Sequence, residues 1–334
     1  MKISVALATY NGQRFVKKQL ESLLNQTRQP DEVVIIDDCS TDNTVGVVTD
    51  FISSNNLDWE FSVAESNQGY KRNFYNCLKK CTGDLIFLCD QDDYWYPEKI
   101  ERVFSVFEDD EHCLAVNSSF DMTDENGEIL APFGSDKKNT TNHGLIGFAV
   151  ERGETIRVDL ETVLVYNISP GCTCCFKKEV VEAYLAVSEC RLPHDWELNI
   201  IAAKRGGLRF LNLPLIGYRQ HGNNAIGLST DDSFGPLKMR GDVDVRFKVL
   251  ELQKAQSDAV RENLDSSNKR QRRFFKKLTK FCQNRESILC DKKLWPCFKN
   301  FFLYPDLKRV ATIHFRGLLG DIIYVIKHKG DKND

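Results

Sequence analysis

Short apolar runs alternate with amphipathic segments over the first quarter of the chain. Between the runs, apolar residues such as Phe15, Leu20 and Leu24 recur at helical spacing. This alternation is typical of a parallel, doubly wound α/β sheet. We expect strands at residues 3–8, 32–36 and 61–64 and in a run ending at Asp90, with helices at 13–26, 43–54 and 70–81.

The pattern is less regular in the middle of the chain and changes again toward its end. Polar residues dominate 133–145, which we interpret as a mobile loop. Helical periodicity returns at 243–264 and in the amphipathic segment 312–326. We therefore expect an α/β domain over residues 1–230 and a helical carboxy-terminal extension over 231–334. Within the first domain, further strands are expected at 113–120, 168–176 and 208–219, and helices at 179–187 and 195–205.

The composition narrows the class of protein only slightly. A net charge of −3 on 334 residues gives no global case for nucleic-acid binding. The twelve cysteines are scattered, which argues against a zinc ribbon and favours free thiols in a reducing cytosol. The amino terminus runs directly into a strand pattern, so we expect no signal peptide. No apolar stretch approaches the ~18 residues that a membrane span needs, and we expect a cytoplasmic protein.

Acidic side chains follow two of the predicted strands directly. The apolar run before Asp90 ends in Asp90, Asp92 and Asp93, and the strand 32–36 ends in Asp37-Asp38. Ligands of open α/β sheets bind at the carboxyl ends of the strands, and we expect these two strands to be neighbours. Carboxylates held so close need a cation or buried donors, and carboxylate oxygens suit Mg²⁺ or Mn²⁺ beside a diphosphate. The alternative interpretation is an acidic turn.

Several motifs occur in order between residues 3 and 225. The first four are Thr9-Tyr10-Asn11, Asp37-Asp38-Cys39-Ser40-Thr41-Asp42, Asn67-Gln68-Gly69 and Asp90-Gln91-Asp92-Asp93. The last three are Gly171-Cys172-Thr173, His194-Asp195-Trp196 and Tyr218-Arg219-Gln220-His221-Gly222-Asn223-Asn224. Together the first four resemble family 2 glycosyltransferases, which have a GT-A fold. The last three resemble the bacterial rhamnosyltransferase branch of that family, although Glu197 stands where that branch often has an aromatic residue.

The resemblance implies a role for each motif. Asp195 would be the general base, and Asp92 and His221 would bind the Mn²⁺ or Mg²⁺ that bridges the donor diphosphate. Thr9, Tyr10, Asn11 and Asp38 would line the base and ribose pocket, and Asp90 would face the ribose or the metal. The other substrate-binding candidates are Asn67, Gly69, Gly171, Cys172, Thr173, His194, Trp196 and Arg219.

The chemistry of an inverting sugar transfer explains these residue types. An acceptor hydroxyl becomes a good nucleophile when a carboxylate takes its proton, and a metal stabilises the departing nucleoside diphosphate. The resemblance implies a donor such as dTDP-rhamnose and a lipid-linked or oligosaccharide acceptor in surface polysaccharide biosynthesis. A UDP-hexose is the nearest alternative donor. A nucleotidyltransferase is disfavoured because residues 9–14 lack a glycine-rich phosphate loop, and a non-catalytic transferase-like binding protein stays open.

Single residues also have structural interpretations. Asp195 is well suited to cap a helix, and His194 and His221 are equally compatible with structural roles. Tyr94 and Trp95 either stack on a sugar or belong to the core. Cys172, Cys174 and Cys175 are typical of buried small hydrophobic residues.

Residues 269–280 hold seven basic residues in twelve, interleaved with aromatic ones such as Phe274 and Phe275. One interpretation is a solvated helix face. The other is a peripheral contact with an anionic membrane at the inner face of the cell membrane, where each basic residue near the lipid contributes ~1 kcal/mol.

Overall fold

The computed structural model describes residues 1–130, 150–165, 167–221, 243–263, 269–307 and 315–328. The predicted loop 133–145 and the motif residues Gly222, Asn223 and Asn224 lie outside these residues. The chain divides into two units, residues 1–163 with 167–227, and residues 164–166 with 228–334.

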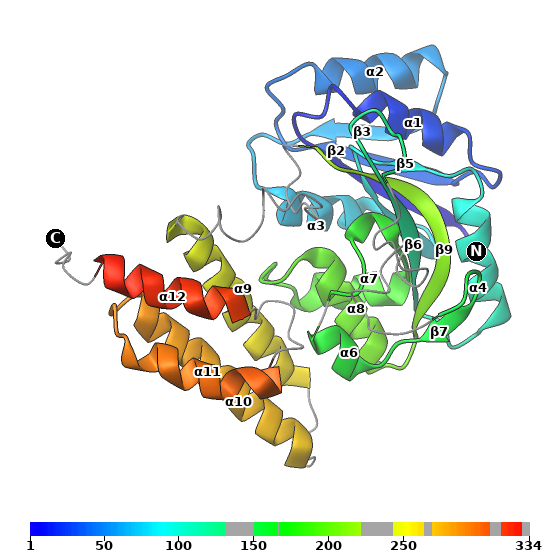
Figure 1. The fold of residues 1–334 in the computed structure, drawn as a ribbon. Coiled ribbons are helices and arrows are strands. Elements are labelled where there is room, and N and C mark those ends of the chain that lie inside the picture. The colour runs from blue at the N-terminus through cyan, green and yellow to red at the C-terminus, as the bar shows by residue number, and fades with distance from the viewer. Residues whose placement is uncertain (131–149, 166, 222–242, 264–268, 308–314, 329–334) are drawn as a thin grey trace. The chain divides into compact units, whose positions relative to one another are not determined.

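The first unit is built on a mixed sheet that has nine strands among the described residues (Figure 1). The sheet order is β3-β2-β1-β4-β8-β6-β9-β5, with β7 beside β9. The strands are β1 (Ile3–Thr9), β2 (Glu32–Asp37), β3 (Glu60–Val63), β4 (Leu85–Asp90), β5 (Tyr94–Trp95), β6 (Ala115–Thr123), β7 (Thr155–Arg157), β8 (Cys174–Lys177) and β9 (Leu208–Arg219).

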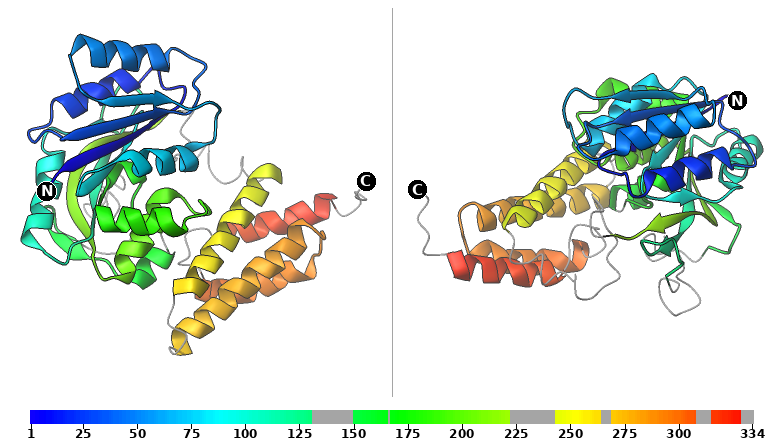
Figure 2. Two further views of the ribbon diagram at one scale, coloured as in Figure 1. Left: turned by 180° about the vertical axis from the view of Figure 1, so that it is seen from behind. Right: turned by 90° about the horizontal axis from the view of Figure 1, so that it is seen from above.

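Helices cover both faces of this sheet. Helices α1 and α2 lie on one face and α3, α7 and α8 on the other (Figures 1 and 2). This follows from right-handed crossovers, because the chain moves outward from β1 to β3 and then returns across the sheet to β4. The helices are α1 (Val16–Leu24), α2 (Thr44–Ser54), α3 (Tyr70–Lys80), α4 (Lys99–Asp109), α6 (Leu160–Val165), α7 (Lys178–Val187) and α8 (His194–Lys204), with a short 3₁₀ turn η1 (Gly171–Thr173).

The parallel pairing of the first four strands is confirmed, but one predicted neighbour relationship is wrong. The strands that end in Asp37 and Asp90 are not adjacent, because β1 lies between β2 and β4 and pairs with both. The return crossover through α3 causes this and reverses the strand order at β1. Such a reversal is the topological switch point at which open α/β sheets bind ligands. All seven residues of β1 are buried, as expected for a strand covered on both faces.

Strand β8 brings a distant segment to this switch point. It pairs antiparallel with β4, so that Leu85 lies opposite Lys177 and Phe87 opposite Cys175. Continuing this register by three residues places Cys172, in η1, opposite Asp90. The sequence predicts an extended strand over 168–176, but η1 interrupts it. Pro170 precedes this turn, and its carbonyl oxygen accepts hydrogen bonds from the Thr173 backbone N–H (3.0 Å) and hydroxyl (2.8 Å).

The second unit is helical in its described part. It contains α9 (Val243–Asn263), α10 (Lys269–Leu289), α11 (Trp295–Leu307) and α12 (Phe315–His328). Its apolar core includes Leu250, Ile288 and Val325. A buried ionic cluster joins three helices, because Arg246 and Arg285 both contact Asp321, at 2.8 and 3.2 Å.

Two properties concern the whole described chain. None of its helices is both long and apolar enough to cross a membrane. All twelve cysteines lie in described residues as free thiols, and Cys290 is the one that is exposed.

Candidate active site

A buried arginine holds the acidic turn after β4, residues 90–93, in place. Arg219, at the end of β9, donates from its backbone N–H to Asp93 Oδ1 (2.9 Å) and from Nε to the Asp92 carbonyl oxygen (2.7 Å). Its guanidinium also lies over the ring of Phe15, 4.9 Å from the centroid. Arg219, implied by the family resemblance as a substrate ligand, therefore shapes the acidic turn itself.

Two groups of potential metal ligands meet at this turn. His221 Nε2 lies 2.9 Å from Asp92 Oδ2, so the two residues implied as metal ligands are in contact. Next to them, Asp90, Asp93 and Cys172 each offer a ligand atom, all within 4.8 Å of one another. Asp93 belongs to the acidic run that we expected at this edge of the sheet, but the family resemblance implied no role of its own for it.

The electrostatics of the turn fit a divalent cation. Burial, followed by the charges of Asp92, Asp93 and Asp195, raises the pKa of Asp90 well above its ordinary value. Burial and the charge of Asp92 raise the pKa of Asp93 to about 7. Asp93 Oδ2 is buried and has no hydrogen-bond partner in the described part of the chain. A bound cation would relieve this repulsion, and the oxygen-rich donor set suits Mg²⁺ or Mn²⁺.

The thiol of Cys172 is a poor ligand for such a cation. Burial raises its pKa well above the ordinary value, so that it remains protonated. A hard cation also prefers oxygen to sulfur. We therefore assign the oxygen donors of this turn, with His221, to the candidate metal site, and place Cys172 in its wall.

A buried lysine lies behind the acidic turn. Lys99 is fully buried at the start of α4, donates from Nζ to the Cys172 carbonyl oxygen and lies 3.6 Å from the centroid of the Trp95 ring. Burial lowers its pKa to about 8, against the charge of Asp93 among others. Trp95, buried beneath this lysine, belongs to the core and supports the turn rather than facing a sugar.

The loops after β1 and β2 form a second group of candidate site residues, at the same edge of the sheet as the acidic turn. Asp37, at the end of β2, accepts hydrogen bonds from Thr9 Oγ1 (2.7 Å) and from Ser40 Oγ (2.6 Å). Asp38 accepts backbone hydrogen bonds from Gln68 (2.9 Å) and Gly69 (2.7 Å). Gly69 has a φ of +82°, which an L side chain rarely adopts, so this turn requires glycine.

The loop after β1 is also tied to its neighbours. Asn11 accepts a hydrogen bond from the Thr41 backbone N–H at 2.8 Å. Gln91 makes two hydrogen bonds to the backbone of Tyr10, as acceptor (2.9 Å) and donor (2.7 Å). A Cβ on Gly12 would lie 2.0 Å from Gln91 Oε1, so this bridge needs a glycine. The bridge connects the implied base pocket to the acidic turn, while 42% of the Tyr10 surface remains exposed.

Asp195 lies in the first turn of α8. Pro193 occupies the N-cap position, so Asp195 is not the capping residue of this helix. Its Oδ2 accepts a hydrogen bond from Asn167 Nδ2 at 2.7 Å. Burial raises the pKa of Asp195 to about 6, while the hydrogen bonds from Asn167 and the backbone oppose that rise. A carboxylate poised close to neutral pH is suited to accept a proton.

His194, next to Asp195 in the chain, packs against α3. Its ring stacks on Phe74 with the centroids 4.0 Å apart, and neither ring nitrogen has a hydrogen-bond partner among the described residues. Burial lowers its pKa to about 3, so the imidazole is neutral. Gly171 faces it, since a Cβ there would lie 3.1 Å from His194 Nε2. The structure thus brings together Gly171, His194 and Asp195 from two separate motifs.

Trp196 points away from this group. It is buried, and its indole N–H donates to the Val163 carbonyl oxygen at 2.6 Å. Glu197 organises the loop before α8, because its carboxylate accepts hydrogen bonds from Ser188 Oγ and from the Leu192 backbone N–H. These contacts fix the start of the helix that carries Asp195.

A buried amide pair anchors the same helix one turn later. Asn199 and Asn117 exchange side-chain hydrogen bonds of 2.8 and 3.1 Å, which link α8 to β6. Cys174 adds a thiol hydrogen bond to Asn117 at 3.0 Å and so ties in β8. Asp195 therefore rests on a helix that is fixed to the sheet by buried polar contacts.

Tyr70 is a residue of the site that sequence reasoning missed. It opens α3, and its pKa is raised to about 12 by partial burial and by the charges of Asp195 and Asp90. The phenol therefore stays protonated within electrostatic reach of Asp195 and Asp90. Its position directly after the Asn67-Gln68-Gly69 motif was the available signal. Asn167 and Lys99 were also missed, and no local pattern marks either one.

With its doubly wound topology and acidic switch point, the first unit has the GT-A fold of glycosyltransferases. The chain belongs to the family described as Glycosyl transferase family 2, which residues 4–181 match. These residues make up more than half of the chain.

Curated relatives of the chain include glycosyltransferases from bacteria. It is 29% identical over 253 residues to the uncharacterized glycosyltransferase alr2836 of Nostoc sp., covering 75% of this chain and 74% of that protein. It is 28% identical over 237 residues to the dTDP-rhamnosyl transferase RfbG of Shigella flexneri, covering 66% of this chain and 73% of that protein.

Solved structures resemble the chain in fold at low sequence identity. TarS 1–349 of S. aureus in complex with UDP-GlcNAc matches with a TM-score of 0.59 and 16% identity, covering 98% of this chain and 91% of that one. The longer TarS structure is covered to 55% of its length. The mannosyltransferase PcManGT of Pyrobaculum calidifontis, in complex with GDP-Man and Mn²⁺, matches with a TM-score of 0.57 and 17% identity, covering 99% and 88%.

Proposed function

We propose that the protein is an inverting, metal-dependent glycosyltransferase that uses a nucleotide-diphosphate sugar. The observation that carries the proposal is that a buried carboxylate, Asp195, with a pKa of about 6, lies close enough to the acidic turn for its charge to raise the pKa of Asp90. A base and a candidate metal–diphosphate site within electrostatic reach of each other are what a direct displacement at an anomeric carbon requires.

In the proposed reaction, Asp195 takes the proton of an acceptor hydroxyl. The acceptor oxygen forms a bond to the anomeric carbon while the bond from that carbon to the donor phosphate oxygen breaks, and the nucleoside diphosphate leaves with the electron pair. Asn167 orients the carboxylate during this step through its hydrogen bond. A divalent metal held by the oxygens of the acidic turn and by His221 would supply Lewis-acid stabilisation of the leaving diphosphate.

We assign binding of the nucleoside part of the donor to the loops after β1 and β2. Thr9, Asn11 and Asp38 would hold the base and ribose, and Tyr10 offers an exposed ring at the same edge. Gly69, Cys172 and Thr173 would complete the walls of the donor pocket. His194 would face the acceptor as a neutral imidazole whose nitrogens have no hydrogen-bond partner in the part of the chain that the structure describes.

We propose dTDP-rhamnose as the donor sugar nucleotide. The support is the motif resemblance and the 28% identity to a protein named as a dTDP-rhamnosyl transferase. The solved relatives in complex with UDP-GlcNAc and GDP-Man favour a nucleotide-sugar donor in general and keep a UDP-hexose as the alternative. The proposed acceptor is a lipid-linked or oligosaccharide glycan in surface polysaccharide biosynthesis.

A donor panel tests this proposal. Purified protein is given dTDP-rhamnose, UDP-glucose, UDP-galactose, UDP-N-acetylglucosamine or GDP-mannose, with Mn²⁺ or with a chelator, and release of the nucleoside diphosphate is measured. Metal-dependent release of dTDP alone supports the rhamnosyl assignment. Preference for a UDP-sugar removes rhamnose and keeps the mechanism. Donor binding is measured by calorimetry in the same panel, and absence of both binding and release with every donor contradicts the enzyme assignment.

A further inference from the structure

Helix α10 has two chemically opposite faces. At about 100° per residue, Lys269, Arg272, Arg273, Lys276, Lys277 and Lys280 fall within an arc of about 140°. Leu278, Phe281 and Cys282 lie on the opposite side, where they are buried. The buried side explains why the helix is stable in this unit, and the basic side is left to face solvent.

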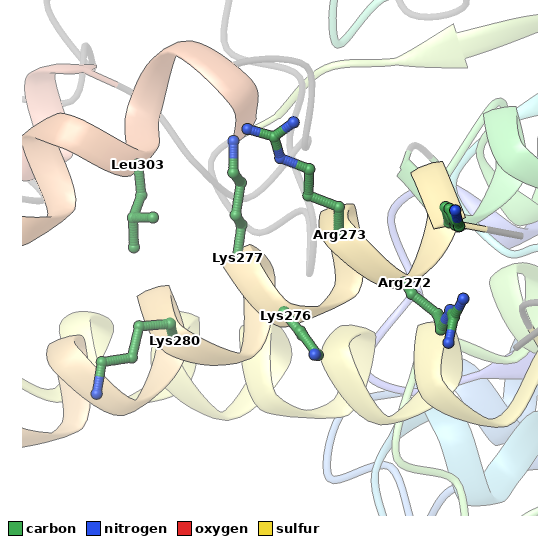
Figure 3. A pocket seen from close by; sticks show the side chains of 7 residues that line it. Arg272, Arg273, Lys276, Lys277, Lys280 and Leu303 are labelled. Carbon is green, nitrogen blue, oxygen red and sulfur yellow. The ribbon is translucent and has the colours of Figure 1, made fainter.

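The basic side lines a groove between α10 and α11. The groove has a volume of about 480 Å³ and is lined by the six basic residues of α10 and by Leu303 of α11. Figure 3 shows Arg273 and Lys277 extending in the same direction from α10, with Leu303 on the neighbouring helix. A concave surface with six cationic groups and one apolar residue is suited to bind anions.

Most of this charge is not neutralised within the protein. Lys277 forms an ion pair with Asp306 of α11. The other five basic residues of the groove have no acidic partner in the part of the chain that the structure describes. Keeping five like charges so close is unfavourable without counter-charges, and an anionic partner would supply them.

Helix α11, which contributes Leu303 to the groove, also carries exposed aromatic side chains. Trp295, Phe298 and Phe302 lie within an arc of about 60° on that helix, and they are 66%, 43% and 82% exposed. Phe302 directly precedes the groove residue Leu303. Large exposed aromatic residues beside a basic face are unusual for a surface that meets only water.

We propose that the basic groove and the aromatic row form a docking surface for an anionic lipid bilayer. Headgroup phosphates would pair with the basic residues of α10, and the aromatic residues of α11 would enter the interface between headgroups and acyl chains. The aromatic row is the reason to choose a bilayer over a soluble anion, since a soluble anion would use the charges alone. The inference rests on the second unit and is independent of the transfer reaction proposed above.

Vesicle flotation of the full chain tests this proposal. The vesicles are phosphatidylcholine, alone or with about one third phosphatidylglycerol. The wild-type protein should float with the anionic vesicles and not with the neutral ones, and salt should weaken its binding. Each basic residue near the lipid strengthens binding about fivefold, so Arg272→Glu with Lys276→Glu should weaken it at least about tenfold.

A matched control separates the groove from net charge. Lys79 and Lys248 are exposed residues outside the groove, and Lys79→Glu with Lys248→Glu changes the net charge by the same amount. This control should bind within about twofold of the wild type. Equal weakening by both double variants would overturn the proposal, as would equal binding of the wild type to neutral and anionic vesicles. Circular dichroism of each variant verifies the helices.

A separate variant tests the aromatic row, which consists of Trp295, Phe298 and Phe302. Phe298→Ser with Phe302→Ser leaves every charge in place and should weaken flotation about tenfold or more while salt sensitivity remains. Unchanged flotation of this variant would contradict the bilayer assignment. Binding of soluble polyphosphate without flotation would likewise overturn it in favour of a phosphate polymer. Nucleoside diphosphate release from the donor should be the same in all these variants, which separates failure of this inference from failure of the transferase assignment.

Discussion

Asn167 Nδ2 donates a hydrogen bond of 2.7 Å to Oδ2 of Asp195. Because Asp195 is buried, this single bond both fixes the direction of the carboxylate and opposes the rise of its pKa. Asn167 does not belong to any of the motifs that identify the family, and its position relative to Asp195 is visible only in three dimensions.

Replacing Asn167 by alanine should therefore change the pH profile as well as the rate. Loss of the hydrogen bond removes a contribution that lowers the pKa of Asp195, so the acid limb of kcat should move to higher pH. We expect kcat at neutral pH to fall about tenfold, as for loss of one hydrogen bond to a charged group. A lower rate with an unmoved acid limb would show that Asn167 acts only on folding.

The wild-type enzyme should lose activity as the pH falls through about 6. Above this pKa Asp195 is ionised and accepts a proton, and below it the carboxyl is protonated and cannot. Asp195→Asn should reduce kcat by about 10²–10⁴ and leave donor affinity within about twofold. Turnover by this variant at the wild-type rate would exclude Asp195 as the base. Donor affinity from calorimetry is the control for correct folding.

Adding one methyl group at Gly12 should disrupt the bridge between the base pocket and the acidic turn. The new Cβ would meet Gln91 Oε1 at 2.0 Å, so Gln91 must release the backbone of Tyr10. We expect Gly12→Ala to cost about 1–2 kcal/mol of unfolding free energy, because the two hydrogen bonds of Gln91 are lost, and to raise the KM for the donor. In a Gln91→Ala background the same substitution should cost little, because the obstacle is gone. Additive effects in this cycle would refute the proposed clash.

Metal binding should distinguish the two groups of ligands at the acidic turn. Asp92→Asn should weaken Mn²⁺ binding at least about tenfold, since an anionic oxygen ligand is lost. Cys172→Ala should leave Mn²⁺ affinity within about twofold, because the buried thiol stays protonated. Calorimetric titration with Mn²⁺ measures both. A large loss of affinity in Cys172→Ala would show that the Cys172 thiol is itself a metal ligand.

The sequence predicts those parts of the fold that depend on local patterns. The strands β1 to β4 and the helices between them are found within a few residues of their predicted ends, because buried parallel strands and amphipathic helices have distinct periods. The parallel pairing of β1 to β4 is confirmed, although the complete sheet is mixed. The GT-A fold, which the family resemblance implied, is confirmed by the solved structures. The helices α9 and α12 also lie close to their predicted ranges.

Other features depend on contacts between distant segments. The order of β2, β1 and β4 follows from the crossover through α3, which no local pattern reveals. Helices α4 and α11 were not predicted, although Val103 and Phe107 of α4 recur at helical spacing. Nothing in the sequence distinguishes Lys99 from an ordinary surface lysine. In the structure it is fully buried behind the acidic turn. Such residues become part of a site through tertiary packing alone.

Of the twelve free thiols, nine are buried, two are half-buried, and Cys290 is exposed. The native protein therefore carries its own attachment point for a maleimide dye, directly after the last residue of α10. A single fluorophore could be placed there without removing any other cysteine. Slower labelling of the remaining thiols would then report how often the rest of the molecule opens.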